Sequence, residues 1–73
     1  MADKPKELAD LAKAETDIAE AKKRIAEQTA LIRQMAERGQ PTAEAEEVLR
    51  SFEEILRAFQ AHQRLIVDLL SRM

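Results

Sequence analysis

The chain has 73 residues, of which 45% are hydrophobic, 36% are charged and 3% are aromatic, and its formal net charge at pH 7 is −2. With one Gly, two Pro and no Cys, the composition excludes a disulfide scaffold and a thiolate metal site, and it argues against an all-β domain, which needs several turns. The low net charge and normal apolar content argue against disorder. Ala, Glu, Lys, Leu and Arg are abundant, which is typical of long helices and coiled coils. We therefore expect a single all-α domain over residues 1–73.

The first predicted element is a helix over about residues 5–38. Pro5 stands near its start, where a helix tolerates proline, and neither Gly nor Pro occurs between Lys6 and Arg38. Its apolar residues recur at alternating steps of three and four, which is the heptad pattern (positions a to g) of a coiled-coil seam. The residues of this predicted seam, at positions a and d, are Leu11, Ala14, Ile18, Ala21, Ile25, Gln28, Ile32 and Met35.

A turn is predicted at residues 39–41. Gly39 suits the left-handed conformation just past a helix end, and Pro41 cannot continue the helix. Because a link of this length joins neighbouring helices, the second helix must run antiparallel to the first. The expected fold is therefore an antiparallel helical hairpin.

The second predicted helix covers about residues 42–73 and begins at Thr42, whose side chain can accept a capping hydrogen bond. Its seam follows the same alternation of three and four. The residues of this second seam are Ala45, Val48, Phe52, Ile55, Phe59, His62, Ile66, Leu69 and Met73. If the turn is centred on Gln40, Ala21 faces Phe59 and Gln28 faces Phe52.

A further row at heptad position e, formed by Leu49, Leu56 and Leu70, runs beside the second seam. Pairing with one helix leaves much of this row in water. A second copy of the chain would cover it and give a four-helix bundle with a two-fold axis. We therefore predict a homodimer with these leucines in its interface. The alternative is that they are scattered surface residues, which are common.

The sequence contains no recognisable catalytic, cofactor or metal site. It has one His, two Ser and three Thr, and it has no Gly-rich loop and no nucleophile motif. We therefore expect no enzyme activity, no cofactor and no metal. His62 has three interpretations: a neutral core residue that fixes the register, an exposed or rim residue, and a pH switch or metal site shared across the dimer. We expect the first of these.

Nucleic acid is the rival class of partner. The possible contact is Lys22, Lys23 and Arg24, but Glu20 and Glu27 flank these bases, and phosphate binding requires a basic face. A solvated helix surface with pairs such as Glu20 to Arg24 explains the same residues. In size and layout only, the hairpin resembles a plasmid-encoded RNA-loop regulator that forms a four-helix bundle. We do not expect a nucleic-acid partner.

No stretch has the length of a signal peptide core or a membrane span. The longest run of large apolar residues is Leu65-Ile66-Val67, which Asp68 ends, whereas a membrane span needs about 20 residues. We therefore expect no membrane association and a cytoplasmic location.

The stretch from Asp17 to about Leu70 resembles a group of short bacterial helical-hairpin proteins that are common in alphaproteobacteria. The resemblance is carried by Ile18-Ala19-Glu20, Arg24-Ile25-Ala26-Glu27-Gln28 and Leu31-Ile32, and, after the turn, by Thr42-Ala43-Glu44-Ala45-Glu46, Leu49, Phe52-Glu53-Glu54 and Leu56. These are mainly seam and cap positions, so the resemblance implies the hairpin. No activity is known for the group, and the resemblance implies none.

Taken together, the sequence favours a small homo-oligomeric bundle that acts as a protein–protein interaction, regulatory or adaptor module, with an unidentified protein partner. A small RNA- or DNA-binding regulator that uses the hairpin dimer is the alternative.

Overall fold

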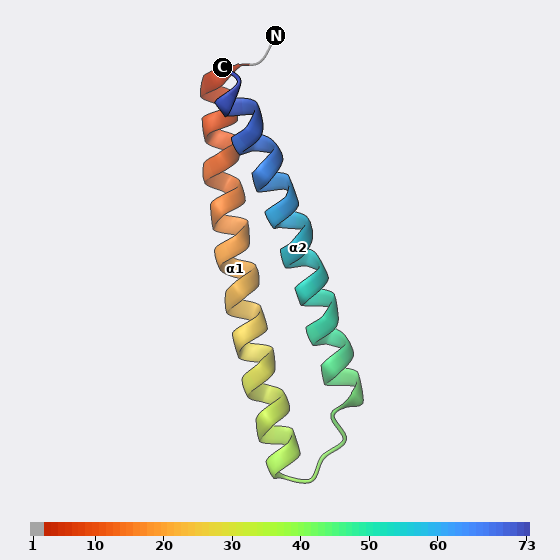
Figure 1. The fold of residues 1–73 in the computed structure, drawn as a ribbon. Coiled ribbons are helices and arrows are strands. Elements are labelled where there is room, and N and C mark those ends of the chain that lie inside the picture. The colour runs from red at the N-terminus through yellow and green to blue at the C-terminus, as the bar shows by residue number, and fades with distance from the viewer. Residues whose placement is uncertain (1–2) are drawn as a thin grey trace.

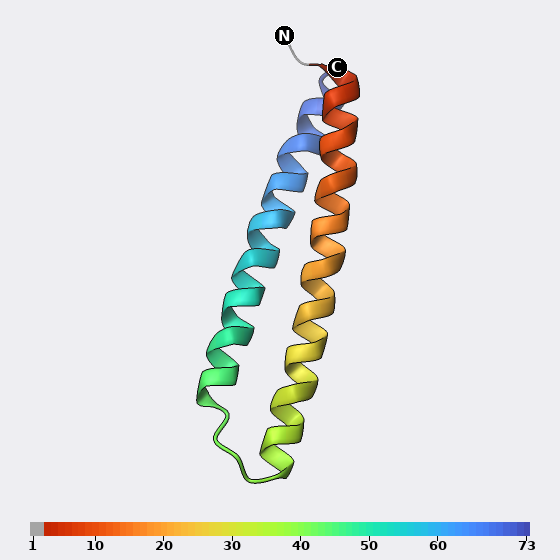
Figure 2. The same ribbon diagram turned by 180° about the vertical axis from the view of Figure 1, so that it is seen from behind.

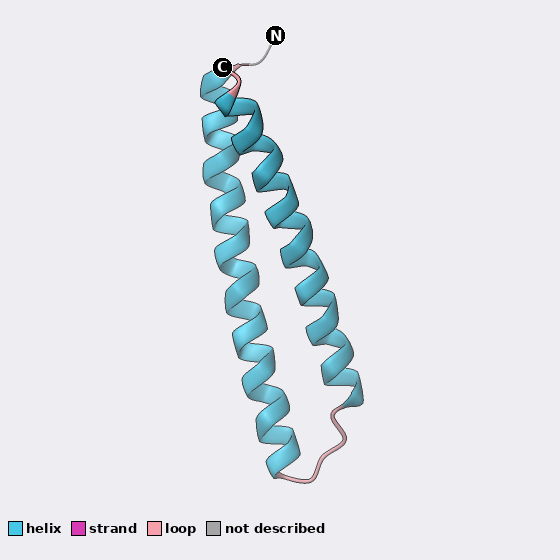
Figure 3. Cartoon of the chain, in the orientation of Figure 1, coloured by secondary structure: helices cyan, strands magenta, loops and turns pink. Residues whose placement is uncertain are grey.

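Two long helices lie side by side and run antiparallel (Figure 1). The computed structural model describes residues 3–73 and consists there of α1 (Lys4–Glu37) and α2 (Ala43–Ser71). Figure 3 shows helices and loops and no strand in this part of the chain. The view from behind has the C-terminal end of α2 beside the start of α1, with the turn at the far end (Figure 2). The all-α hairpin predicted from the sequence is confirmed.

The start of α1 is capped by the residue before it. Asp3 has extended backbone angles (φ −103°, ψ 105°), and its carboxylate accepts a hydrogen bond from the Lys6 backbone N–H at 3.4 Å. This is the usual geometry of a capping residue, which supplies an acceptor to a free N–H of the first turn. Pro5 lies in that first turn, where its missing N–H costs nothing.

The end of α1 depends on Gly39, as predicted. Its φ of 71° lies in the left-handed region, which L side chains rarely adopt. This conformation directs the Gly39 N–H to the Ala36 carbonyl at 3.1 Å and the Gln40 N–H to the Met35 carbonyl at 2.9 Å. The pair of bonds is a Schellman motif, which satisfies carbonyls that the end of a helix leaves free.

Thr42 occupies the cap position of α2, but its side chain makes no capping hydrogen bond. The prediction that the Thr42 side chain accepts a capping hydrogen bond is therefore wrong. Its backbone angles (φ −110°, ψ −2°) are close to helical, whereas a capping side chain needs an extended backbone to reach the next N–H groups. The Thr42 carbonyl nevertheless accepts the first helical bond, from the Glu46 N–H at 2.9 Å.

The core of the hairpin is narrow. The buried residues are Ala14, Ile18, Ala21, Ala45 and Ile66. Three of these five are alanines, whose small side chains let the two helices approach closely. The Cα atoms extend over 56 × 14 × 13 Å with a radius of gyration of 16.7 Å, against about 11 Å for a compact domain of this length. The hairpin is thus a rod with little interior.

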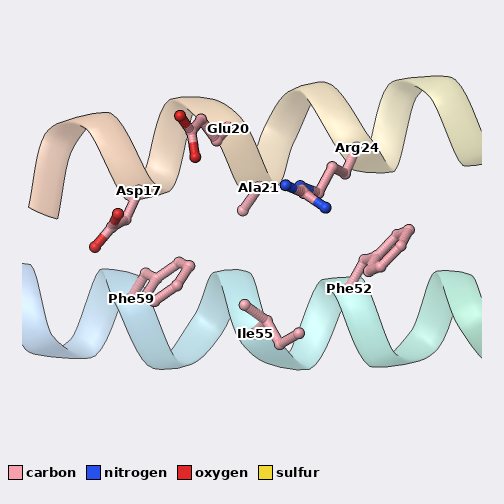
Figure 4. A pocket seen from close by; sticks show the side chains of 7 residues that line it. All are labelled: Asp17, Glu20, Ala21, Arg24, Phe52, Ile55 and Phe59. Carbon is pink, nitrogen blue, oxygen red and sulfur yellow. The ribbon is translucent and has the colours of Figure 1, made fainter.

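The register of the two helices differs from the prediction by one to two helical turns. Figure 4 places Ala21 across from Ile55, where Phe59 was expected. The side chain of Gln28 reaches the backbone of Ala45, where Phe52 was expected. The reason lies in residues 38–42, which are not helical. This segment runs back alongside the last part of α1 before α2 begins. At the turn end of the hairpin, α1 therefore extends beyond the first turn of α2 (Figure 1).

Candidate functional site

The helix α2 is rotated about its axis relative to the prediction. The leucines expected in the dimer interface, Leu49, Leu56 and Leu70, are half-buried within the single chain. The row expected in the seam at position d is instead exposed. We call Val48, Ile55, His62 and Leu69 the outer row. The apolar side chains of the outer row are 42%, 46% and 37% exposed at Val48, Ile55 and Leu69.

The physical reason is the width of the apolar arc on α2. Three rows, at positions a, d and e, are apolar on this helix, and α1 covers only two of them. Phe52 and Phe59 at position a are half-buried and Ile66 is buried, as expected for the seam. On α1, the predicted seam residues are all buried or half-buried; they are Leu11, Ala14, Ile18, Ala21, Ile25, Gln28, Ile32 and Met35.

A groove opens between the helices beside the outer row (Figure 4). It has a volume of about 210 Å³. Its apolar lining comes from Ala21 of α1 and from Phe52, Ile55 and Phe59 of α2, and the charged residues that line it, Asp17, Glu20 and Arg24, all come from α1. An apolar floor with a few charged groups on one side is typical of an interaction surface.

Of the three charged residues that line the groove, only Asp17 has an ion-pair partner within residues 3–73. Asp17 accepts a hydrogen bond from the Lys13 ammonium at 3.1 Å, one helical turn away. Arg24 and Glu20 form no ion pair with any residue of 3–73, so the predicted pair between them is absent. The Arg24 guanidinium thus lies at an apolar groove without a carboxylate partner among the described residues.

His62 is exposed on α2. The prediction that it is a buried core residue is therefore wrong, because the rotation of α2 takes position d away from α1. Within residues 3–73, no cluster of three His, Cys, Asp or Glu side chains could hold a metal ion.

The three bases proposed for nucleic acid do not form one patch. Lys22, Lys23 and Arg24 are all exposed, but consecutive residues of a helix point about 100° apart. Lys23 is directed away from the groove, at position f, whereas Arg24 lines it. The structure therefore spreads these charges around α1.

Neither described helix combines the length and apolar character needed to cross a bilayer. Comparisons of the chain with family models, with curated proteins and with solved structures gave no match.

The groove itself was missed by the sequence reasoning. A signal for it exists, because Asp17 and Arg24 are opposite charges seven residues apart at position g, directly beside the seam. Position g flanks the apolar a and d positions of a coiled coil, and charges at this position influence which helix packs beside it and in which orientation.

Proposed function

We propose that this chain is a protein–protein interaction module, of regulatory or adaptor type, that first associates with a second copy of itself. Two hairpins would form a four-helix bundle through the outer row and the groove. The observation that carries this proposal is the exposure of Val48, Ile55 and Leu69 in one row. Exposed apolar residues that gather on one helix face mark an interaction site, whereas single ones do not.

The accessible surface supports the same association. The chain exposes 5591 Å², which is about 1,000 Å² more than the roughly 4,600 Å² of a compact protein of 8.3 kDa. A standard interface buries about 800 Å² on each partner. The extra accessible surface of the hairpin is therefore similar to the area that each partner buries in a standard interface. Packing two hairpins face to face would remove this surface from water.

The small size of the chain adds a second argument for self-association. Domains of this length rarely form enough core alone, and they depend on disulfides, metals or oligomerisation. A disulfide is excluded because the chain has no Cys. In the bundle, the charged outer faces of both helices would remain available to a further protein partner.

The nucleic-acid alternative has weaker support, since the bases of α1 are spread around the helix. Mobility shift with structured RNA at about 50 mM salt should show no complex below the micromolar range of non-specific binding. A submicromolar complex that is lost when Lys22, Lys23 and Arg24 are all replaced by Ala would favour the regulator instead.

Multi-angle light scattering tests the association. We expect twice the chain mass of 8.3 kDa at micromolar concentration. Ile55→Glu should reduce the mass to that of one chain, because an unpaired charge would be buried in the interface. Ala61→Glu adds the same charge at an exposed position outside the outer row and should leave the dimer intact. A wild-type chain with the mass of a monomer would contradict the proposal.

A further inference from the structure

We infer that the two hairpins pack antiparallel, about a two-fold axis at the level of Ala21 and Ile55, and that Asp17 and Arg24 of each copy pair with the same two residues of the other. This inference rests on the proposed self-association and specifies its geometry. It assigns the groove to a second copy of this chain and gives Arg24 a function in recognition.

The face that contains the groove has two unlike halves. On α2 it presents the outer row, which is apolar except for His62. On α1 it presents position g, which holds Asp10, Asp17, Arg24 and Leu31 at intervals of seven residues, together with Glu20, which lines the groove beside Arg24. Asp17, Arg24 and Ile55 all line the same groove, which shows that the two rows lie on one side of the hairpin.

Two such faces can be stacked in two ways. An axis along the bundle would place α1 of one copy over α2 of the other. Arg24, which forms no ion pair within residues 3–73, would then lose water against apolar residues without gaining a partner, and Asp17 would keep only its pair with Lys13. Burying an unpaired charge is costly. An axis across the bundle places α1 on α1 and α2 on α2, so that charges meet charges and apolar residues meet apolar residues.

The heights of the charged residues on α1 and of the outer row on α2, measured along the hairpin, agree with a two-fold axis across the bundle. Asp17 and Arg24 lie on opposite sides of Ala21 along α1, about 10 Å apart at 1.5 Å per residue. A two-fold axis at this level therefore brings Asp17 to the height of the partner subunit's Arg24, and it makes the same pair a second time. Charge complementarity of this reciprocal kind is what an interface between identical faces requires.

On α2 the same axis falls at Ile55, which lies across the groove from Ala21 (Figure 4). Ile55 would then meet its own copy, and Val48 would meet the partner subunit's His62, since each lies seven residues from Ile55. The midpoint between Asp17 and Arg24 on α1 and the midpoint of the outer row at Ile55 on α2 thus lie at the same height, so one two-fold axis can pass through both. The sequence does not require this agreement, which depends on the register seen in the structure.

Spin-label distances test the orientation. The chain has no Cys, so each single-Cys variant carries one label. In Gln40→Cys, at the turn, an antiparallel dimer should separate the two labels by roughly 50 Å, because the turns lie at opposite ends of a rod with 1.5 Å rise per residue. In Ala58→Cys, near the proposed axis, the labels should lie within roughly 25 Å. A dimer with short distances at both sites would overturn the antiparallel orientation alone, whereas a monomeric mass with no distance signal would overturn the proposed function as well.

Charge reversal tests the ion pairs. Asp17→Arg and Arg24→Asp should each weaken the dimer by about tenfold or more, because each creates two repulsive contacts across the axis. The double variant restores both pairs with reversed sign, so its dissociation constant should return to within about threefold of wild type. Lys23→Asp makes the same change of charge as Arg24→Asp on the outer side of α1 and should have little effect. A double variant that is as weak as the single ones would exclude the pairing.

Discussion

Gln28 Nε2 donates a hydrogen bond of 2.9 Å to the carbonyl oxygen of Ala45. In the described part of the chain, this side-chain bond joins α1 to α2, whereas the other side-chain hydrogen bonds stay within one helix or its cap. Coiled-coil seams are otherwise apolar and tolerate sliding, so a polar residue at a seam position specifies register. Gln28 therefore ties the first turn of α2 to a fixed height on α1.

Replacing Gln28 by Met tests this tie, because Met has a similar length and no donor. We expect the free energy of unfolding to fall by about 1 kcal/mol, the usual net contribution of one hydrogen bond. Urea midpoints at a fixed protein concentration would measure it, since the stability of a dimer depends on concentration.

The exposed Gln34 provides the control, because it lies on the same helix away from α2. Gln34→Met should shift the midpoint by less than about 0.5 kcal/mol, as is usual for surface substitutions. Equal midpoints for Gln28→Met and Gln34→Met would show that the bond to Ala45 contributes nothing to the fold.

The turn gives a second prediction. At Gly39 an added Cβ would meet no atom within 4 Å, so space is not the constraint, but the φ of 71° is unfavourable for a side chain. Gly39→Ala should therefore destabilise the hairpin by about 1 kcal/mol. Gly39→Asn should cost less, because Asn tolerates the left-handed region better. Thermal melting by circular dichroism would rank them, and an Ala variant as stable as wild type would contradict the conformational explanation.

How much the sequence could predict depends on how local each feature is. Gly39 and the steps of three and four are local signals, and they predict two helices and the turn between them. Which rows of α2 face α1 is a property of packing, because Val48 and Leu49 are both apolar and stand side by side in the chain. The exposure of Val48 and the partial burial of Leu49 were therefore beyond a sequence argument.

The register was not predictable for a related reason. Gly39 and Pro41 show where in the sequence the turn lies. They do not show how far the non-helical residues 38–42 run back along α1 before α2 begins. The groove depends on that register, since Asp17, Ala21 and Arg24 meet Phe59, Ile55 and Phe52 only in the observed alignment (Figure 4).

A third prediction concerns the N-terminal end of α1. The Lys6 ammonium donates a hydrogen bond to the Asp10 carboxylate at 3.0 Å, and this bond, followed by the charges of Asp10 and Glu7, raises the pKa of Lys6 above its ordinary value of 10.5. Because the folded pKa is the higher one, the stabilising effect is complete below pH 10.5 and is lost as the pH rises through the folded pKa. NMR titration of the Lys6 side chain should show a lower pKa in Asp10→Asn. An unchanged pKa would mean that the pair does not persist in solution.

The last prediction concerns His62, the one polar member of the outer row. In the proposed antiparallel bundle it lies against the partner subunit's Val48, so His62→Leu would make this contact apolar. Burying the larger apolar side chain should strengthen association by about 1 kcal/mol, or roughly fivefold in the dissociation constant. Sedimentation velocity over a dilution series would measure the change. Ala61→Leu places the same side chain one position earlier, at an exposed site outside the row, and it should leave the constant unchanged. If both substitutions strengthen association equally, general hydrophobicity is responsible, and the outer row does not form the interface.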